Sequence, residues 1–106
     1  MIADDCMTTK VVYNTEVLKK GDVLWLYEMM LEEEGAVPFY IGRGMIHTID
    51  RSSMKVEYVE IETNKWKTLI LMPDNVVLSG EATEQQLRAV KLEGSTLYTF
   101  EKVDIK

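Results

Sequence analysis

The chain of 106 residues has one cysteine, one histidine and no long hydrophobic run. A lone cysteine, Cys6, cannot form a disulfide within the chain, which favours a reducing compartment. No apolar stretch approaches the roughly 20 residues that a membrane-spanning helix needs. The first ten residues lack the basic start and apolar run of a secretory signal peptide. We therefore expect a cytoplasmic protein with no membrane segment.

The residue types that perform most enzyme chemistry are also scarce. His47 is the only histidine, and it lies in an apolar segment typical of a strand. No serine has the Gly-x-Ser-x-Gly surroundings of a hydrolase nucleophile, and Gly42-Arg43-Gly44 lacks the further glycines of a phosphate-binding loop. No set of His, Cys, Asp and Glu has the spacing of metal ligands. The sequence predicts no catalytic residues, no metal and no cofactor, and hence a protein that is not an enzyme.

Positive charge is limited, since the net charge is −6. An acidic protein repels phosphate backbones, which argues against nucleic acid as the main partner. The middle third of the sequence is nevertheless close to neutral. Its basic residues could form a modest basic face, and they include Arg43, Arg51, Lys65 and Lys67. A nucleic-acid-associated accessory protein is therefore the alternative function.

The apolar content is ample, because 46% of the residues are hydrophobic and the chain has two Trp and five Tyr. This is enough for one core, and the length fits a single domain over 1–106. We expect residues 1–9 to form a flexible tail and 10–17 to be extended. Lys19–Asp22 then reads as a turn, because it contains Gly and Asp.

Short strands bounded by polar turns dominate the rest of the chain. Turn residues at 50–53 and 62–65 separate three apolar segments, which predicts an antiparallel meander. We expect strands over Phe39–Ile49, Met54–Ile61 and Trp66–Met72, followed by a short closing strand over Val76–Leu78. Gly42 and Gly44 within the first of these predict a bulge or bend that a small barrel needs to close.

The segment Val23–Leu31 fits two patterns. Asp22 and Gly35 could cap a helix with one apolar stripe. The run Val-Leu-Trp-Leu-Tyr after a Gly-Asp turn favours a strand over Val23–Glu28, with 32–35 as an acidic loop. We adopt the strand.

The best helix signal begins at Thr83. Thr83 and Gln86 fit a capping box, and Gly94 is a suitable stop, so we expect a helix to about Lys91. A final strand over Thr96–Ile105 follows from its alternating pattern. The predicted fold is thus mainly β, with a short C-terminal helix and a last strand.

Three stretches of the segment 20–78 belong together: Lys20-Gly21-Asp22-Val23, Tyr40-Ile41-Gly42-Arg43-Gly44-Met45-Ile46 and Met72-Pro73-Asp74-Asn75-Val76. On these residues, the segment resembles a small SH3-like or Tudor-like barrel. Residues 79–106 lie outside it as a helix-plus-strand extension. The resemblance implies a module that binds proline-rich peptides, methylated side chains or RNA through aromatic side chains at strand ends and loops.

Five residues are the candidates for such binding: Trp25, Tyr27, Tyr40, Arg43 and Trp66. Aromatic side chains near a carboxylate could hold a cationic ligand. A barrel this small also needs aromatic side chains inside, so we expect Trp25, Tyr58, Tyr40 and Trp66 in the core. The binding role and the core role make opposite predictions about exposure.

An interface is expected beside the acidic loop, where Met29, Met30 and Leu31 could leave apolar area exposed. The edges of a meander also need protection, and pairing with a second copy provides it. We therefore expect a non-catalytic interaction module whose partner is a protein, a peptide or a homo-oligomer.

Overall fold

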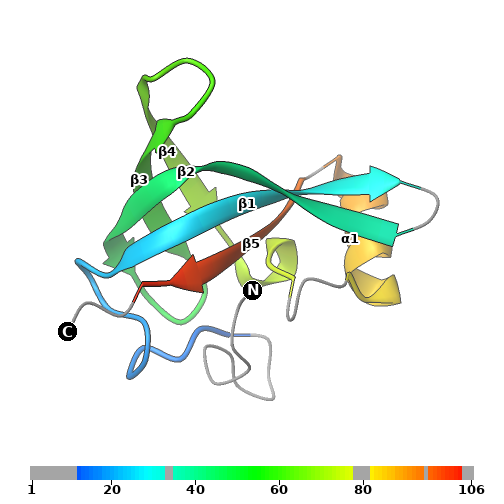
Figure 1. Ribbon diagram of the computed structural model, residues 1–106. Helices are drawn as coiled ribbons and strands as arrows, with labels where there is room; N and C mark the ends of the chain where they lie inside the picture. The colour runs from blue at the N-terminus through cyan, green and yellow to red at the C-terminus, as the bar shows by residue number, and fades with distance from the viewer. Residues whose placement is uncertain (1–11, 33–34, 78–81, 95, 104–106) are drawn as a thin grey trace.

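The computed structural model describes residues 12–32, 35–77, 82–94 and 96–103, and it is mainly β. One antiparallel five-stranded sheet has the order β4-β3-β2-β1-β5 (Figure 1). The strands are β1 (Val23–Glu32), β2 (Gly35–Ile49), β3 (Met54–Glu60), β4 (Trp66–Leu71) and β5 (Leu97–Lys102). A 3₁₀ helix, η2 (Pro73–Asn75), follows β4, and the helix α1 (Glu84–Glu93) precedes β5. Within the described ranges, no helix has the length and apolar character needed to cross a membrane.

The structure confirms the predicted meander and the choice of a strand over a helix at Val23. Both β1 and β2 are longer than expected, because β1 continues to Glu32 and β2 already begins at Gly35. The acidic loop predicted over 32–35 was therefore too long. Pro38 is tolerated within β2 because β3 pairs with β2 only from Gly42 onward, which leaves Pro38 on an edge.

Two predicted extended segments were wrong. Val76 forms a single parallel bridge with Tyr98, and no closing strand over 76–77 appears; Leu78 lies outside the described residues. The strand that closes the sheet is β5, which pairs with β1. Residues 15–17 form a turn, because the Asn14 carbonyl accepts hydrogen bonds from Val17 N and Leu18 N at 3.1 and 3.0 Å.

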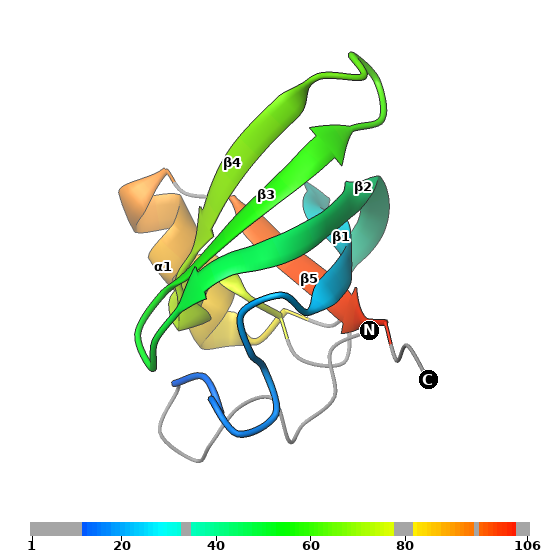
Figure 2. The same cartoon turned by 90° about the vertical axis from the view of Figure 1, so that its left-hand side faces the viewer.

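The sheet is strongly curved (Figure 2). The main core lies against its inner face. All five strands contribute buried side chains, such as Leu26, Ile46, Val56, Leu71 and Phe100. The segment before β1 closes this core with Tyr13 and Leu18, and Tyr13 Oη donates to the Leu71 carbonyl at 2.9 Å. The N-terminal segment therefore belongs to the folded body from Tyr13 onward.

A second, smaller core lies under α1, where Val90 packs with Met29, Val77 and Leu97. The predicted capping box is present: Thr83 Oγ1 accepts from Gln86 N at 3.1 Å, and Gln86 Oε1 accepts from Thr83 N at 2.9 Å. The predicted stop at Gly94 is also confirmed, with φ of 68°. This helix covers only one end of the sheet (Figure 1).

Candidate functional site

One row of side chains crosses all five strands. It runs from Glu101 on β5 through Trp25, Arg43 and Val59 to Trp66 on β4. Directly paired residues of an antiparallel sheet project from the same face, and successive residues alternate between faces. Because Leu24 and Leu26 are fully buried in the main core, this row lies on the opposite face, here called the outer face.

Aromatic side chains gather on the β1–β2 part of the outer face. The ring of Tyr40 lies 5.8 Å from that of Trp25 and 5.7 Å from that of Tyr27, in tilted arrangements. The guanidinium carbon of Arg43 lies 5.9 Å from the centre of the Trp25 ring. Such aromatic pairs contribute about 0.5–1.5 kcal/mol each, and an exposed cation–π contact about 0.5–1 kcal/mol. The cluster therefore orders four side chains that the sequence placed in two separate strands.

A β-bulge places Tyr40 in this cluster. Leu26 pairs with Gly42 but Tyr27 pairs with Tyr40, so Ile41 is an extra residue in β2. The bulge lets Ile41 turn into the main core, where it is 8% exposed, while Tyr40 meets Tyr27 on the outer face. Gly42 marks the bulge, as the sequence predicted.

The outer face is hollowed between β1 and β4 into a groove with a volume of about 740 Å³. Its lining includes Trp25, Tyr40, Arg43, Met45, Ile61 and Trp66, and it is called the outer groove below. Four of the five predicted binding residues lie here, and Tyr27 adjoins them through Tyr40. Met45 and Ile61 were not predicted, although their place in the strand alternation is visible in the sequence.

Exposure decides between the two roles proposed for the aromatic residues. Trp66 is 75% exposed and Trp25 is 36% exposed, whereas Tyr58 is 7% exposed. The core prediction was right for Tyr58 and wrong for Trp66 and Trp25; Tyr40 is half-buried. The register explains the difference, because Tyr58 pairs with Gly44 and faces inward.

The Tyr27 hydroxyl extends the cluster toward β5, since it donates to Glu101 at 3.5 Å. Partial burial and the Glu101 carboxylate both raise the pKa of Tyr27. Its hydroxyl therefore stays a neutral donor and acceptor at the rim of the outer groove.

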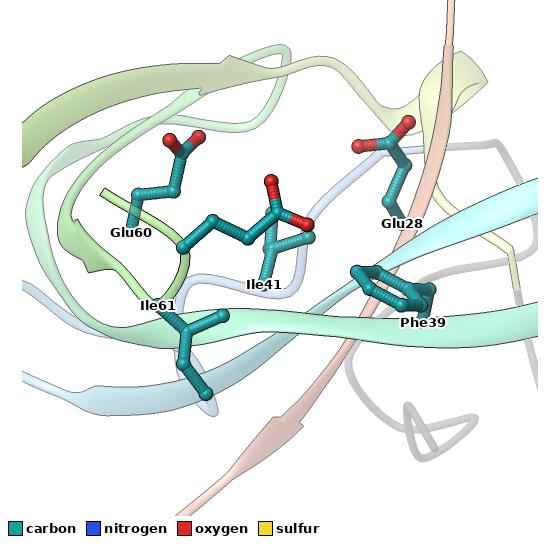
Figure 3. A pocket seen from close by; sticks show the side chains of 6 residues that line it. Glu28, Phe39, Ile41, Glu60 and Ile61 are labelled. Carbon is teal, nitrogen blue, oxygen red and sulfur yellow. The ribbon is translucent and has the colours of Figure 1, made fainter. Parts of the chain in front are cut away.

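An acidic pocket of about 360 Å³ lies on the inner-face side of the sheet (Figure 3), because Glu28 and Glu60 alternate with the outer-face residues Tyr27 and Val59. Three carboxylates, from Glu28, Glu60 and Glu62, line it together with the apolar side chains of Phe39, Ile41 and Ile61. In Figure 3 the carboxyl groups of Glu28 and Glu60 point to the same side of the pocket. Ile61, in the turn after β3, lines both cavities, so the pocket and the outer groove meet at this turn although they open on opposite faces of the sheet. No local sequence pattern indicates this pocket, because its acidic residues come from β1, β3 and the following turn.

Glu60 is held in its charged form. Lys67 Nζ lies 2.8 Å from a Glu60 carboxylate oxygen, and the Thr63 hydroxyl donates to Glu60 at 2.9 Å. These two hydrogen bonds lower the pKa of Glu60, with that from Lys67 the larger cause. Burial is the main cause that raises the pKa of Tyr98, and Glu28 adds to it. The pocket thus presents negative charge beside neutral phenols.

The other predicted residues do not assemble. Met29 is 2% exposed in the second core, and the side chains of Met30 and Leu31 are outside those described, so that interface stays a prediction. Arg51 and Lys65 lie in turns at opposite ends of β3, and Lys67 pairs with Glu60. His47 Nδ1 lies 4.0 Å from a carboxylate oxygen of Glu57, and both side chains are about half exposed. No group of described His, Cys, Asp and Glu side chains is arranged to hold a metal ion.

No family model, curated protein or solved structure matches the chain.

Proposed function

We propose that the protein is a non-catalytic binding module that takes a segment of a partner protein in its outer groove. The observation that carries this proposal is the row formed by Trp25, Arg43 and Trp66, which the sheet register presents on one face. Tryptophan and arginine are the residue types most enriched at binding hot spots. A tryptophan that is 75% exposed gains most from a partner that removes it from water.

The two neighbouring cavities suggest the chemistry of the bound segment. An apolar or aromatic side chain would fill the outer groove between Trp25 and Trp66. A Lys or Arg further along the same segment would pass the turn at Ile61 and reach the acidic pocket on the inner-face side of the sheet. The net charge of −6 supports a basic partner, because complementary charge steers association and penalises wrong partners.

The SH3-like resemblance remains part of this proposal. A four-stranded meander and a last strand that returns to β1 are what support it. We also propose a cytoplasmic location, for which the support is the single cysteine among 106 residues.

A protein partner is favoured over nucleic acid by the arrangement of the basic residues. Arg51 and Lys65 are separated by the length of β3, and the Lys67 ammonium is already paired. A surface that follows a phosphate backbone needs contiguous positive charge. Nucleic-acid association is therefore the second outcome that the experiment must distinguish.

The experiment uses the two tryptophans as probes. The chain has only Trp25 and Trp66, and both line the outer groove, so tryptophan fluorescence reports on this site. A random peptide library is selected on the protein, and the affinity of each selected peptide is measured by fluorescence titration. Trp66→Ala should weaken binding about 10- to 30-fold. Leu92→Ala is the control, because Leu92 is 81% exposed on α1, outside the groove.

The expected result is selection of peptides with an apolar anchor and a basic residue. Peptides that bind Trp66→Ala as well as the unchanged protein would exclude the outer groove as the site. A fluorescence change with RNA that disappears steeply as salt increases would instead support nucleic-acid association.

A further inference from the structure

The strand β4 ends the sheet, and no described strand pairs with its outer edge. Its side chains on the outer face include Trp66, 75% exposed, and Ile70, 64% exposed. An exposed edge strand with apolar side chains is a template for pairing with another chain.

The backbone groups on this edge can be assigned from the ladder. Glu60 N donates to the Lys65 carbonyl at 2.9 Å, and in an antiparallel ladder every second pair is hydrogen-bonded. Counting by two along the β3–β4 register, Lys67, Leu69 and Leu71 direct their backbone groups toward β3. The backbone groups of Trp66, Thr68 and Ile70 therefore point to the open edge.

The usual protections of an edge strand are weak in β4. No proline lies within 66–71. The one lysine within β4, Lys67, directs its ammonium to Glu60 at 2.8 Å, so it does not extend across the edge. The ladder ends after Leu71, because the Met72 carbonyl accepts a hydrogen bond from Asn75 N at 2.8 Å.

We propose that β4 pairs antiparallel with β4 of a second copy of this chain. The two-fold axis relating the copies passes midway between their two Thr68 residues. Trp66 and Ile70 then oppose each other across the axis, since each lies two positions from Thr68. The three outward residues of each strand form about six hydrogen bonds, because each such pair exchanges two. Two antiparallel strands thus become the centre of one continuous sheet.

The side chains favour this register and this occupant. Trp66 opposite Ile70 is an aromatic–β-branched pair, which stabilises a sheet. Lys67 opposes Leu69, so no like charges face each other. A register centred on Lys67 would place the lysines of the two copies opposite each other. A register centred on Leu69 would pair Trp66 with Met72, whose carbonyl already accepts a hydrogen bond from Asn75 N in η2. The self-complementary spacing is the reason for choosing a second copy over an unrelated strand.

Pairing would also extend the binding surface. Both outer faces lie on one side of the joined sheet, because the axis is perpendicular to it. Ile70 of the second copy then stands next to Trp66, and each outer groove gains a wall at its β4 end.

Site-directed cysteines test the register. In a Cys6→Ser background, Thr68→Cys places two thiols directly opposite each other, with Cα atoms about 5.5 Å apart, within disulfide reach. Ile70→Cys is the control, since its two copies would lie about 13 Å apart. Mixing Ile70→Cys with Trp66→Cys should restore a disulfide that neither variant forms alone.

Light scattering tests the association itself. The measured mass of the unchanged protein should rise from that of one chain to twice that value between micromolar and near-millimolar concentration. Thr68→Pro should stay at one chain while folded, because the Thr68 N–H points to the edge and edge strands tolerate proline. Ile70→Lys should behave in the same way. A constant one-chain mass for the unchanged protein, or equal cross-linking of the Thr68→Cys and Ile70→Cys variants, would overturn the proposal.

Discussion

Gly42 lies against the backbone of Val59 so closely that a β-carbon on Gly42 would overlap the Val59 carbonyl oxygen. Its φ of 155° is also one that other residues rarely adopt. Gly42→Ala should therefore destabilise the protein by about 1–3 kcal/mol, the usual cost of overpacking. A lower urea midpoint, measured by circular dichroism, would show this loss.

Gly94→Ala is the matched control for that substitution. Gly94 also has a positive φ, 68°, but a β-carbon on Gly94 would meet no atom within 4 Å. Its cost should be only the backbone penalty of about 1 kcal/mol. Equal losses in the two variants would mean that the close approach to Val59 contributes nothing.

Truncation to alanine should cost much more stability at Phe100 than at Trp66. Phe100 is fully buried, so Phe100→Ala should cost about 3–5 kcal/mol. Trp66→Ala should change the free energy of unfolding by no more than about 0.5 kcal/mol, because the side chain is 75% exposed. Thermal denaturation of both variants measures the contrast. A large loss for Trp66→Ala would show that the residue serves stability rather than binding.

Thr83→Ala should cost about 0.5–2 kcal/mol, since it removes the side chain that accepts from Gln86 N. The loss should extend beyond α1, because Val90 packs on Met29 and Leu97 of the sheet. Thr83→Ser keeps the acceptor and should retain most of the stability. Identical denaturation midpoints for all three proteins would indicate that the cap is not needed.

Stability should fall at alkaline pH because of Tyr13. Burial raises the pKa of its phenol, so the folded protein keeps a proton that the unfolded chain loses near pH 10. The contribution of Tyr13 to the free energy of unfolding is complete below about pH 10 and is lost progressively as the pH rises further. Urea midpoints at neutral and alkaline pH should differ less in Tyr13→Phe than in the unchanged protein. That variant should also lose about 0.5–1.5 kcal/mol at neutral pH, with the hydrogen bond to Leu71.

Local patterns in the sequence were sufficient for the meander and the capped helix. The turn at Asp50 is an example: one carboxylate oxygen of Asp50 accepts from Ser52 N and Ser53 N, each at 2.8 Å. These hydrogen bonds lower the pKa of Asp50. The Thr83–Gln86 cap is equally local, so both features were visible within four residues of sequence.

The closing strand could not be predicted in the same way, because its partner is distant. Val76 has the composition of a strand, but β5 takes the position beside β1, and Val76 meets β5 only through a single bridge to Tyr98. The candidate binding residues could be chosen from the sequence by residue type. Whether each of them is buried or exposed depends on the register between neighbouring strands, which the sequence does not show directly. The one-residue bulge at Ile41 changes which neighbouring side chains face outward, and no local signal beyond Gly42 indicated it.

The pairing of β1 with β5 has a consequence for synthesis of the protein. Tyr27 and Glu101 are diagonal neighbours joined by a hydrogen bond across this pair, although they are 74 positions apart. A ribosome adds about 5–20 residues per second, so β1 waits about 4–15 s for its partner strand. During that time the apolar segment around Trp25 has one unpaired edge on the nascent chain, where it is prone to aggregation. Rapid overproduction at high temperature should therefore favour inclusion bodies, and slow synthesis in the cold should favour folded protein.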